Sequence, residues 1–105
     1  MEEIIGAHIE DPDGNPAGGR TEHTGLTIEW QNGPLGRGAE RKEQNGAMVE
    51  DVIGAAIDRL LFYQQSKFAC FQNDLAIRLL RMALEILQWR TRMREARGVE
   101  GTHVI

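Results

Sequence analysis

The chain has 105 residues, of which 41% are hydrophobic and 27% charged, a composition typical of a folded domain and too apolar for a disordered one. This length predicts one domain, and no uncharged apolar run approaches the ~18 residues that a membrane span needs. One cysteine and three scattered histidines exclude an internal disulfide and lack zinc-ligand spacing, so we expect neither a metal nor a cofactor. The first residues are acidic where a signal peptide would be basic, which predicts an intracellular protein.

The net charge of −4 conceals a division along the chain. Residues 1–58 carry 12 acidic and 4 basic side chains, whereas residues 59–97 carry 3 acidic and 8 basic ones, and Glu100 adds one more negative charge. A basic segment on an acidic protein disfavours polynucleotide binding, which needs a broad positive surface. Two interpretations stay open, a confined site for a small anion and a merely solvated helix face.

The first 46 residues predict strands and loops, because they hold nine of the twelve glycines and all three prolines. A weak strand is predicted over 4–9, and a clearer one over 26–31, where apolar and polar residues alternate strictly. We expect a loop over 11–20, and a loop or a poor strand over 36–46. Two strands are not stable alone, so this part must pack on something else.

From residue 47 onward the apolar residues recur at steps of three and four, which is typical of helices. The spacing predicts a helix over roughly 48–64 and a second from about Asn73 to Arg97, followed by Gly98 as a natural stop. The short connection between them favours antiparallel packing. We therefore predict one α+β domain, with a small N-terminal antiparallel sheet in residues 1–46 and a long two-helix hairpin with a tail in residues 47–105.

On the second helix, the predicted apolar stripe continues as a row of arginines. The second helix is longer than the first by about 12 Å at ~1.5 Å per residue, which would place the arginines on an overhang beyond the start of the first helix. Arginine forks suit phosphate groups, but the same side chains can meet carboxylates of a neighbouring chain, such as Glu50 or Asp51. The stripe comprises Ala76, Leu79, Leu80, Ala83, Ile86 and Leu87, and the row comprises Arg90, Arg94 and Arg97.

Aromatic residues gather around the predicted helix–helix turn, namely Tyr63, Phe68 and Phe71. They can offer flat faces to a base or plug the end of the helical core. Asn73 can contact a base edge or cap the second helix. Because Asn73 and Arg90 are about 25 Å apart along the helix, a ligand that reaches both ends needs two antiparallel chains. The wide apolar stripes independently predict an obligate dimer or a larger oligomer.

No catalytic set is visible in the sequence. Ser66 has no evident base, Cys70 has no evident histidine partner, and the glycine-rich stretch 33–38 lacks the lysine of a phosphate loop. We therefore expect a protein that is not an enzyme.

Several segments carry a family resemblance. They are Phe68-Ala69-Cys70 with Asn73, the pairs Arg90-Thr91 and Arg94-Glu95, and above all the closing run from Arg97 to His103. Together they resemble phage proteins of the Thoeris anti-defence sponge family, of the first-described type, which share a helical hairpin with anti-CBASS sponges of cyclic oligonucleotides. The resemblance spans roughly residues 26–103.

The resemblance implies a non-enzymatic sponge in the host bacterial cytoplasm. It would bind cyclised ADP-ribose isomers, or cyclic di- or trinucleotides, between the subunits of a dimer or hexamer, and release them unaltered. Tyr63 would stack on the base, and Asn73 would contact the base or the ribose. The remaining ligand-binding residues expected from the resemblance are Arg90 and Arg94 on the phosphates, Thr102 closing the pocket, and Phe68, Arg97 and Glu100.

Two other functions compete with this interpretation. In the first, the chain is a structural or protein-binding oligomer whose arginine face meets an acidic partner. In the second, it is a small RNA- or DNA-binding protein, which the overall charge disfavours. We expect neither a polynucleotide nor a membrane as a partner.

Overall fold

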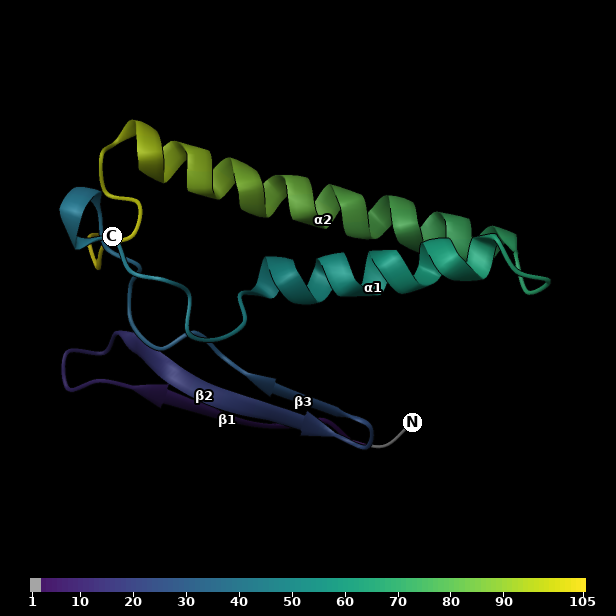
Figure 1. The fold of residues 1–105 in the computed structure, drawn as a ribbon, viewed down its shortest axis with the longest axis horizontal. Coiled ribbons are helices and arrows are strands. Elements are labelled where there is room, and N and C mark those ends of the chain that lie inside the picture. Colours follow the sequence, from purple (N-terminus) through teal and green to yellow (C-terminus); the bar gives the residue numbers. More distant parts are fainter. Residues whose placement is uncertain (1–2) are drawn as a thin grey trace. The chain divides into compact units, whose positions relative to one another are not determined.

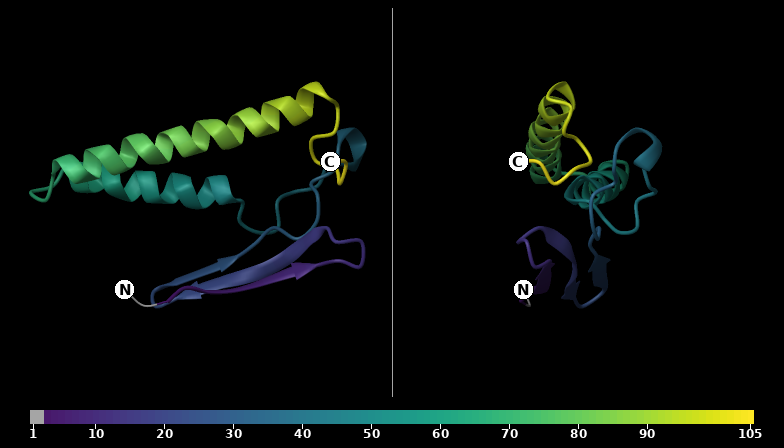
Figure 2. Two further views of the ribbon diagram at one scale, coloured as in Figure 1. Left: turned by 180° about the vertical axis from the view of Figure 1, so that it is seen from behind. Right: turned by 90° about the vertical axis from the view of Figure 1, so that its left-hand side faces the viewer.

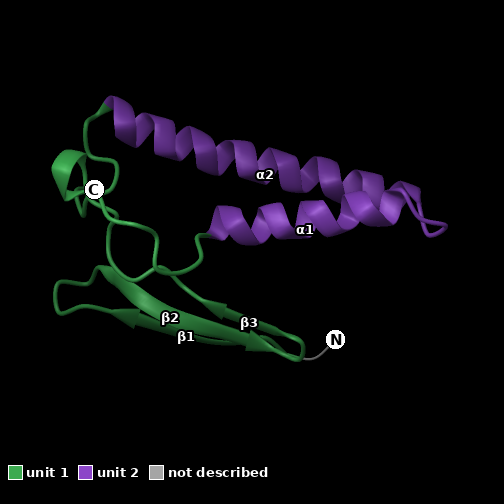
Figure 3. Ribbon diagram, viewed as in Figure 1, with its two compact units in different colours: residues 1–48, 97–105 green, residues 49–96 purple. Residues whose placement is uncertain are grey.

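A computed structural model describes residues 3–105, so the acidic start at Met1 and Glu2 lies outside the described residues. The chain divides into two compact units (Figure 3). Residues 1–48 and 97–105 form one, which we call the sheet unit, and residues 49–96 form the other, which we call the hairpin unit. Within residues 3–105, no helix combines the length and the hydropathy of a membrane span.

The sheet unit holds a three-stranded antiparallel sheet in the order β1-β2-β3, and the strands lie side by side in every view (Figures 1 and 2). Its strands are β1 (Ile5–Glu10), β2 (Pro16–His23) and β3 (Leu26–Glu29). The antiparallel sheet predicted for the N-terminal part is therefore confirmed.

The loop predicted over 11–20 is wrong in its second half, because strand β2 begins at Pro16. Its sequence shows no apolar alternation, but it is the central strand and forms ladders with both neighbours. Gly19 permits the close approach of β1: it has a φ of +131°, and a Cβ atom there would collide with the carbonyl oxygen of Ala7. Pro16 is the first residue of the strand, where a missing N–H is tolerated.

The second predicted strand ends early, at Glu29. Beyond it, Trp30 forms only an isolated bridge with Ala47, and its indole N–H donates a 2.7 Å hydrogen bond to Oγ1 of Thr21. The predicted loop at 36–46 contains one short 3₁₀ helix, η1 (Gly38–Glu40).

The hairpin unit consists of two helices that lie side by side, α1 (Val49–Gln64) and α2 (Phe71–Ala96) (Figures 1 and 2). Both predicted helices are confirmed to within about two residues. Helix α2 begins earlier than expected, so Asn73 lies inside its first turn and is not the capping residue. Glu50 and Asp51 lie in the first turn of α1, where the helix dipole favours negative charge.

The face of α2 that α1 covers agrees with the predicted stripe in part, because four of the six predicted residues are half-buried, namely Ala76, Leu80, Ala83 and Leu87. Ile77 is the most buried residue of α2, at 3% exposed, and Ile57 is its counterpart on α1 at 8%. Leu79 and Ile86 were assigned to the covered stripe, but they are 58% and 59% exposed. The covered row instead follows steps of three and four through Ile77, Leu80, Leu84, Leu87, Thr91 and Arg94.

Candidate functional site

Arg90 of α2 lies beside the first turn of α1. Its Nη2 atom is 3.7 Å from Oε1 of Glu50, and the arginine side chain is 62% exposed. Long, exposed ion pairs of this kind contribute only about 0–1 kcal/mol to stability. Arg90 is therefore level with the start of α1, and the prediction that it lies on an overhang beyond α1 is wrong. Its acidic neighbour Glu50 belongs to the same chain and not to a neighbouring one.

The three arginines of the predicted row occupy different settings. Arg94 is half-buried and lies in the last turn of α2, where the helix dipole favours a cation. Arg97 belongs to the sheet unit, and its Nη2 donates a 2.6 Å hydrogen bond to the carbonyl oxygen of Ile105. The row is therefore not one continuous helix face: only Arg94 follows the covered side of α2, and Arg90 is exposed.

The turn between α1 and α2 is held by side-chain hydrogen bonds. The Gln64 amide exchanges two 3.0 Å hydrogen bonds with the backbone of Cys70, and the Ser66 hydroxyl donates one of 2.6 Å to the carbonyl oxygen of Tyr63. Nδ2 of Asn73 donates to the carbonyl oxygen of Phe68 at 3.4 Å. The turn thus has a defined shape, and Asn73 contributes to it.

The aromatic rings near the turn do not plug the helical core of this chain. Phe68 is 69% exposed and Phe71 is 68% exposed, while Tyr63 is 37% exposed. These faces are open to a ligand or to another chain. Of the two interpretations from the sequence, the core plug is therefore wrong within a single chain.

Two residues on α1 that are not among the predicted ligand-binding residues, Arg59 and Phe62, lie next to Tyr63. The guanidinium carbon of Arg59 is 4.8 Å from the ring centroid of Phe62 and 4.9 Å from that of Tyr63. The two rings are 6.0 Å apart and inclined by 55°. The spacing i, i+3, i+4 is a signal that predicts such contacts on a helix.

In the sheet unit, the C-terminal tail is joined to the loop around η1. Nη1 of Arg41 donates to both carboxylate oxygens of Glu100, at 2.8 and 3.1 Å, and Nη1 of Arg37 donates to the Glu100 carbonyl oxygen at 3.0 Å. The Glu100 side chain is only 18% exposed. Thr102 donates through Oγ1 to the carbonyl oxygen of Val99 at 2.6 Å. Glu100 and Thr102, both expected to bind ligand, thus also fix the conformation of the tail.

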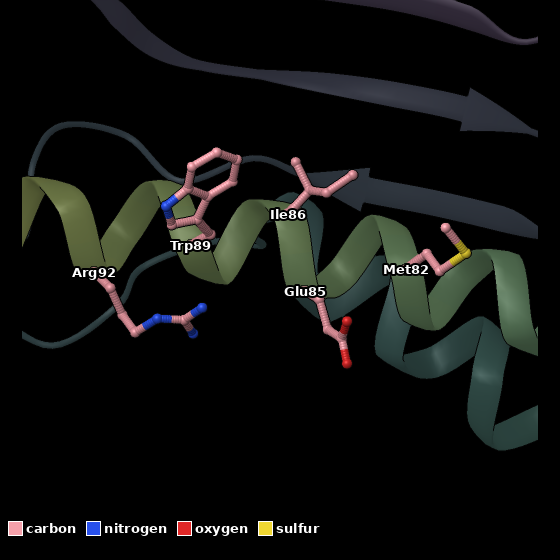
Figure 4. Close-up of a pocket in the computed structure, with 5 residues that line it drawn as sticks. All are labelled: Met82, Glu85, Ile86, Trp89 and Arg92. Carbon is pink, nitrogen blue, oxygen red and sulfur yellow. The ribbon is translucent and has the colours of Figure 1, made fainter.

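A second apolar row, which we call the outer stripe, follows α2 on the side roughly opposite the covered row. Its six side chains are between 42% and 59% exposed. A shallow hollow lies along it, with Trp89 and Ile86 pointing to one side of the helix and Glu85 and Arg92 to another (Figure 4). The outer stripe comprises Leu75, Leu79, Met82, Ile86, Trp89 and Met93.

Comparison with known proteins identifies a relative of this chain. No family model matches the chain. The chain is 46% identical over 77 residues to the protein named Thoeris anti-defense 1 from Bacillus phage SBSphiJ7. The alignment covers 73% of this chain and 51% of that protein, so the chain spans about half the length of its relative.

Proposed function

This chain belongs to the Thoeris anti-defence family, and we propose that it acts as a non-enzymatic sponge for a cyclic nucleotide immune signal. The signal would be a cyclised ADP-ribose isomer or a cyclic di- or trinucleotide. Holding it in the cytoplasm of the host bacterium would keep the defence effector silent. The name of the relative supports the anti-defence role, the cyclic nucleotide signal is what the family resemblance implies, and the arginines and aromatic residues of this chain are compatible with such a ligand.

Arg90 is the residue whose geometry supports the proposal most. It is a largely exposed guanidinium whose ion-pair partner is the Glu50 carboxylate at 3.7 Å, longer than the 2.7–2.9 Å typical of a strong charged hydrogen bond. A phosphate that accepts two parallel N–H hydrogen bonds from the guanidinium can displace the Glu50 carboxylate. Arg94, one turn further along α2, adds positive charge near the same end of the helix.

The base-binding end of the pocket is expected at the helix–helix turn. Tyr63 and Phe68 expose ring faces there, and stacking on such faces stabilises a bound base by ~1–3 kcal/mol. Asn73 lies at the same end of α2, about 25 Å from Arg90 along the helix. No small ligand spans that distance within one hairpin, so we propose that the pocket forms between two subunits.

The outer stripe supports this self-association. Burying six exposed apolar side chains along one helix face would stabilise the protein. The α2 helix of a second subunit can bury them, because its own outer stripe has the same spacing. Arg78, Glu85 and Arg92 flank the stripe at seven-residue intervals. In an antiparallel pair about a two-fold axis, Glu85 can approach Arg78 of the partner subunit in the same register that sets Asn73 opposite Arg90 of the partner subunit, and each such contact occurs twice. We therefore propose a dimer or hexamer built on this face.

Calorimetry and thermal shift across cyclised ADP-ribose isomers and cyclic oligonucleotides test the proposed function. We expect tight binding of at least one of them, and recovery of the intact compound after the protein is heat-denatured. Mass spectrometry of the released compound distinguishes a sponge from an enzyme. Recovery of a cleaved product, or no binding by any compound of the series, would refute the proposal.

One alternative is favoured by a specific observation. Arginines of this chain repeatedly meet carboxylates: Arg20 with Glu29, Arg41 with Glu100, and Arg90 with Glu50. A protein-binding oligomer whose arginines meet an acidic partner would use the same preference. It predicts no affinity for cyclic nucleotides, together with binding of an acidic protein surface that decreases as salt rises.

A further inference from the structure

Arg59, Phe62 and Tyr63 form a compact group on the last turns of α1, which we call the Arg59 cluster. The guanidinium lies over both rings, with its carbon 4.8 Å and 4.9 Å from their centroids. All three residues belong to one helix, so the contacts are local and independent of any other part of the chain. The cluster therefore places a positive charge and two aromatic faces within one small surface.

The guanidinium of Arg59 remains able to bind an anion. Stacking on a ring occupies the face of the guanidinium, whereas its N–H donors lie in its plane and point outward from the edge. Among residues 3–105, no carboxylate lies within 4.0 Å of Arg59, in contrast to Arg78, whose Nη2 is 2.8 Å from Oδ2 of Asp74. The donors of Arg59 thus have no competing acidic group.

The rings of the cluster also remain accessible. Phe62 is 54% exposed and Tyr63 is 37% exposed, although each carries the guanidinium on one side. The sequence indicated a stacking role for Tyr63 but not for Phe62. Phe62 is the more exposed of the two residues.

We infer that the Arg59 cluster binds the adenine nucleotide moiety of the signal, with the base against the Phe62 and Tyr63 rings and a phosphate oxygen accepting hydrogen bonds from Arg59. The inference rests on the proposed function and adds Arg59 and Phe62 to the binding residues. The two stacking contacts restrict the arginine before the ligand arrives, which lowers the entropy that binding must remove. A nucleoside without phosphate gains only the stacking, so the cluster should discriminate AMP from adenosine.

The test is an NMR titration of the full chain with AMP and with adenosine, following the ring protons of Phe62 and Tyr63. We expect AMP to shift both sets of signals and to bind about tenfold more tightly than adenosine. Arg59→Gln should remove that difference. Arg59→Lys should restore part of it, because it keeps the charge but loses the planar fork. Arg81→Gln removes an exposed arginine of α2 outside the cluster and should leave both affinities unchanged.

The outcomes separate this inference from the proposed function. If AMP leaves the Phe62 and Tyr63 ring signals unshifted, or if Arg59→Gln binds AMP as the unmodified chain does, the cluster only stabilises α1 and the inference is wrong. That result is compatible with cyclised ADP-ribose binding elsewhere on the chain. Conversely, ring shifts that depend on Arg59, without binding of any cyclic signal, support the cluster and refute the sponge.

Discussion

Nη2 of Arg90 lies 3.7 Å from Oε1 of Glu50, which joins the C-terminal part of α2 to the first turn of α1. The Glu50 side chain is 29% exposed and that of Arg90 is 62% exposed, so water reaches both charges. The pair is therefore a weak link in the hairpin. It is also the point at which a phosphate and a carboxylate would compete for one guanidinium.

Removing the competing carboxylate should strengthen ligand binding. With Glu50→Gln, Arg90 no longer has an acidic neighbour, and the affinity for cyclised ADP-ribose should rise about two- to fivefold, the range expected for an exposed ion pair. Isothermal titration calorimetry measures the change. Asp58→Asn removes an exposed acidic group from the same helix and serves as the control. Weaker binding by Glu50→Gln would mean that Glu50 itself contacts the ligand.

Truncation of Arg90 should weaken ligand binding strongly without unfolding the chain. Arg90→Ala removes a charged, bidentate donor, and we expect the affinity to fall about 10- to 100-fold. Arg90→Lys should recover only part of the affinity. The melting temperature should change little, because the pair with Glu50 contributes about 0–1 kcal/mol. A variant that unfolds would show that Arg90 is structural and would favour the protein-binding alternative.

The periodicity of the sequence was sufficient to predict the two helices and part of the α2 face that meets α1, but it wrongly added Leu79 and Ile86 to that face. Two rows of apolar residues at steps of three and four run along α2, one through Ile77 and Leu84 and another through Leu79 and Ile86. Either row satisfies the pattern of a covered helix face. Strand β2 was not predicted because its sequence has no apolar alternation. Hydrogen bonds with β1 and β3 stabilise it instead.

Part of the candidate site could likewise be predicted from residue type. The arginines and aromatics were found because their chemistry suits a nucleotide. Arg59 was not identified from the sequence, because the spacing i, i+3, i+4 occurs on many helices. Only the distances in the structure show that its guanidinium stacks on Phe62 and Tyr63. The ion pair between Glu100 and Arg41 could not be predicted from the sequence, because 59 positions separate the two residues.

The Glu100 carboxylate should control the order of the C-terminal tail. Glu100→Gln replaces an ion-paired group that is mostly buried, so the tail should open more often and stability should fall by about 1 kcal/mol. Hydrogen exchange of the amides in residues 98–103 reports the opening. Glu43→Gln, an exposed glutamate of the same unit, should leave exchange unchanged. If Glu100→Gln alters ligand affinity with exchange of the free protein unchanged, Glu100 is a ligand-binding residue.

The turn before β2 should lose stability in acid. Oδ1 of Asp11 accepts 2.9 Å hydrogen bonds from the backbone N–H groups of Asn15 and Asp13, and these bonds lower the pKa of the Asp11 carboxyl, with Asn15 the main cause. A pKa lower in the folded than in the unfolded chain stabilises the fold above about pH 4, and the gain is lost as pH falls through the folded value. Asp11→Asn should therefore be less stable than the unmodified chain at pH 7, and the difference in stability should shrink progressively as pH falls below about 4. A difference that persists in acid would contradict this assignment.

The outer stripe should determine both assembly and ligand binding. Ile86→Lys places a charge in the middle of the exposed apolar row, and a charge that loses its water in an interface is costly unless it is paired. Sedimentation should therefore show a shift toward the 11.8 kDa monomer, accompanied by loss of affinity for cyclised ADP-ribose, since the proposed pocket needs two subunits. Gln88→Lys adds the same charge to α2 at an exposed polar position and should change neither property. If the unmodified chain already sediments as a folded monomer at micromolar concentration and still binds the signal, the pocket lies within one chain and the subunit-interface proposal is wrong.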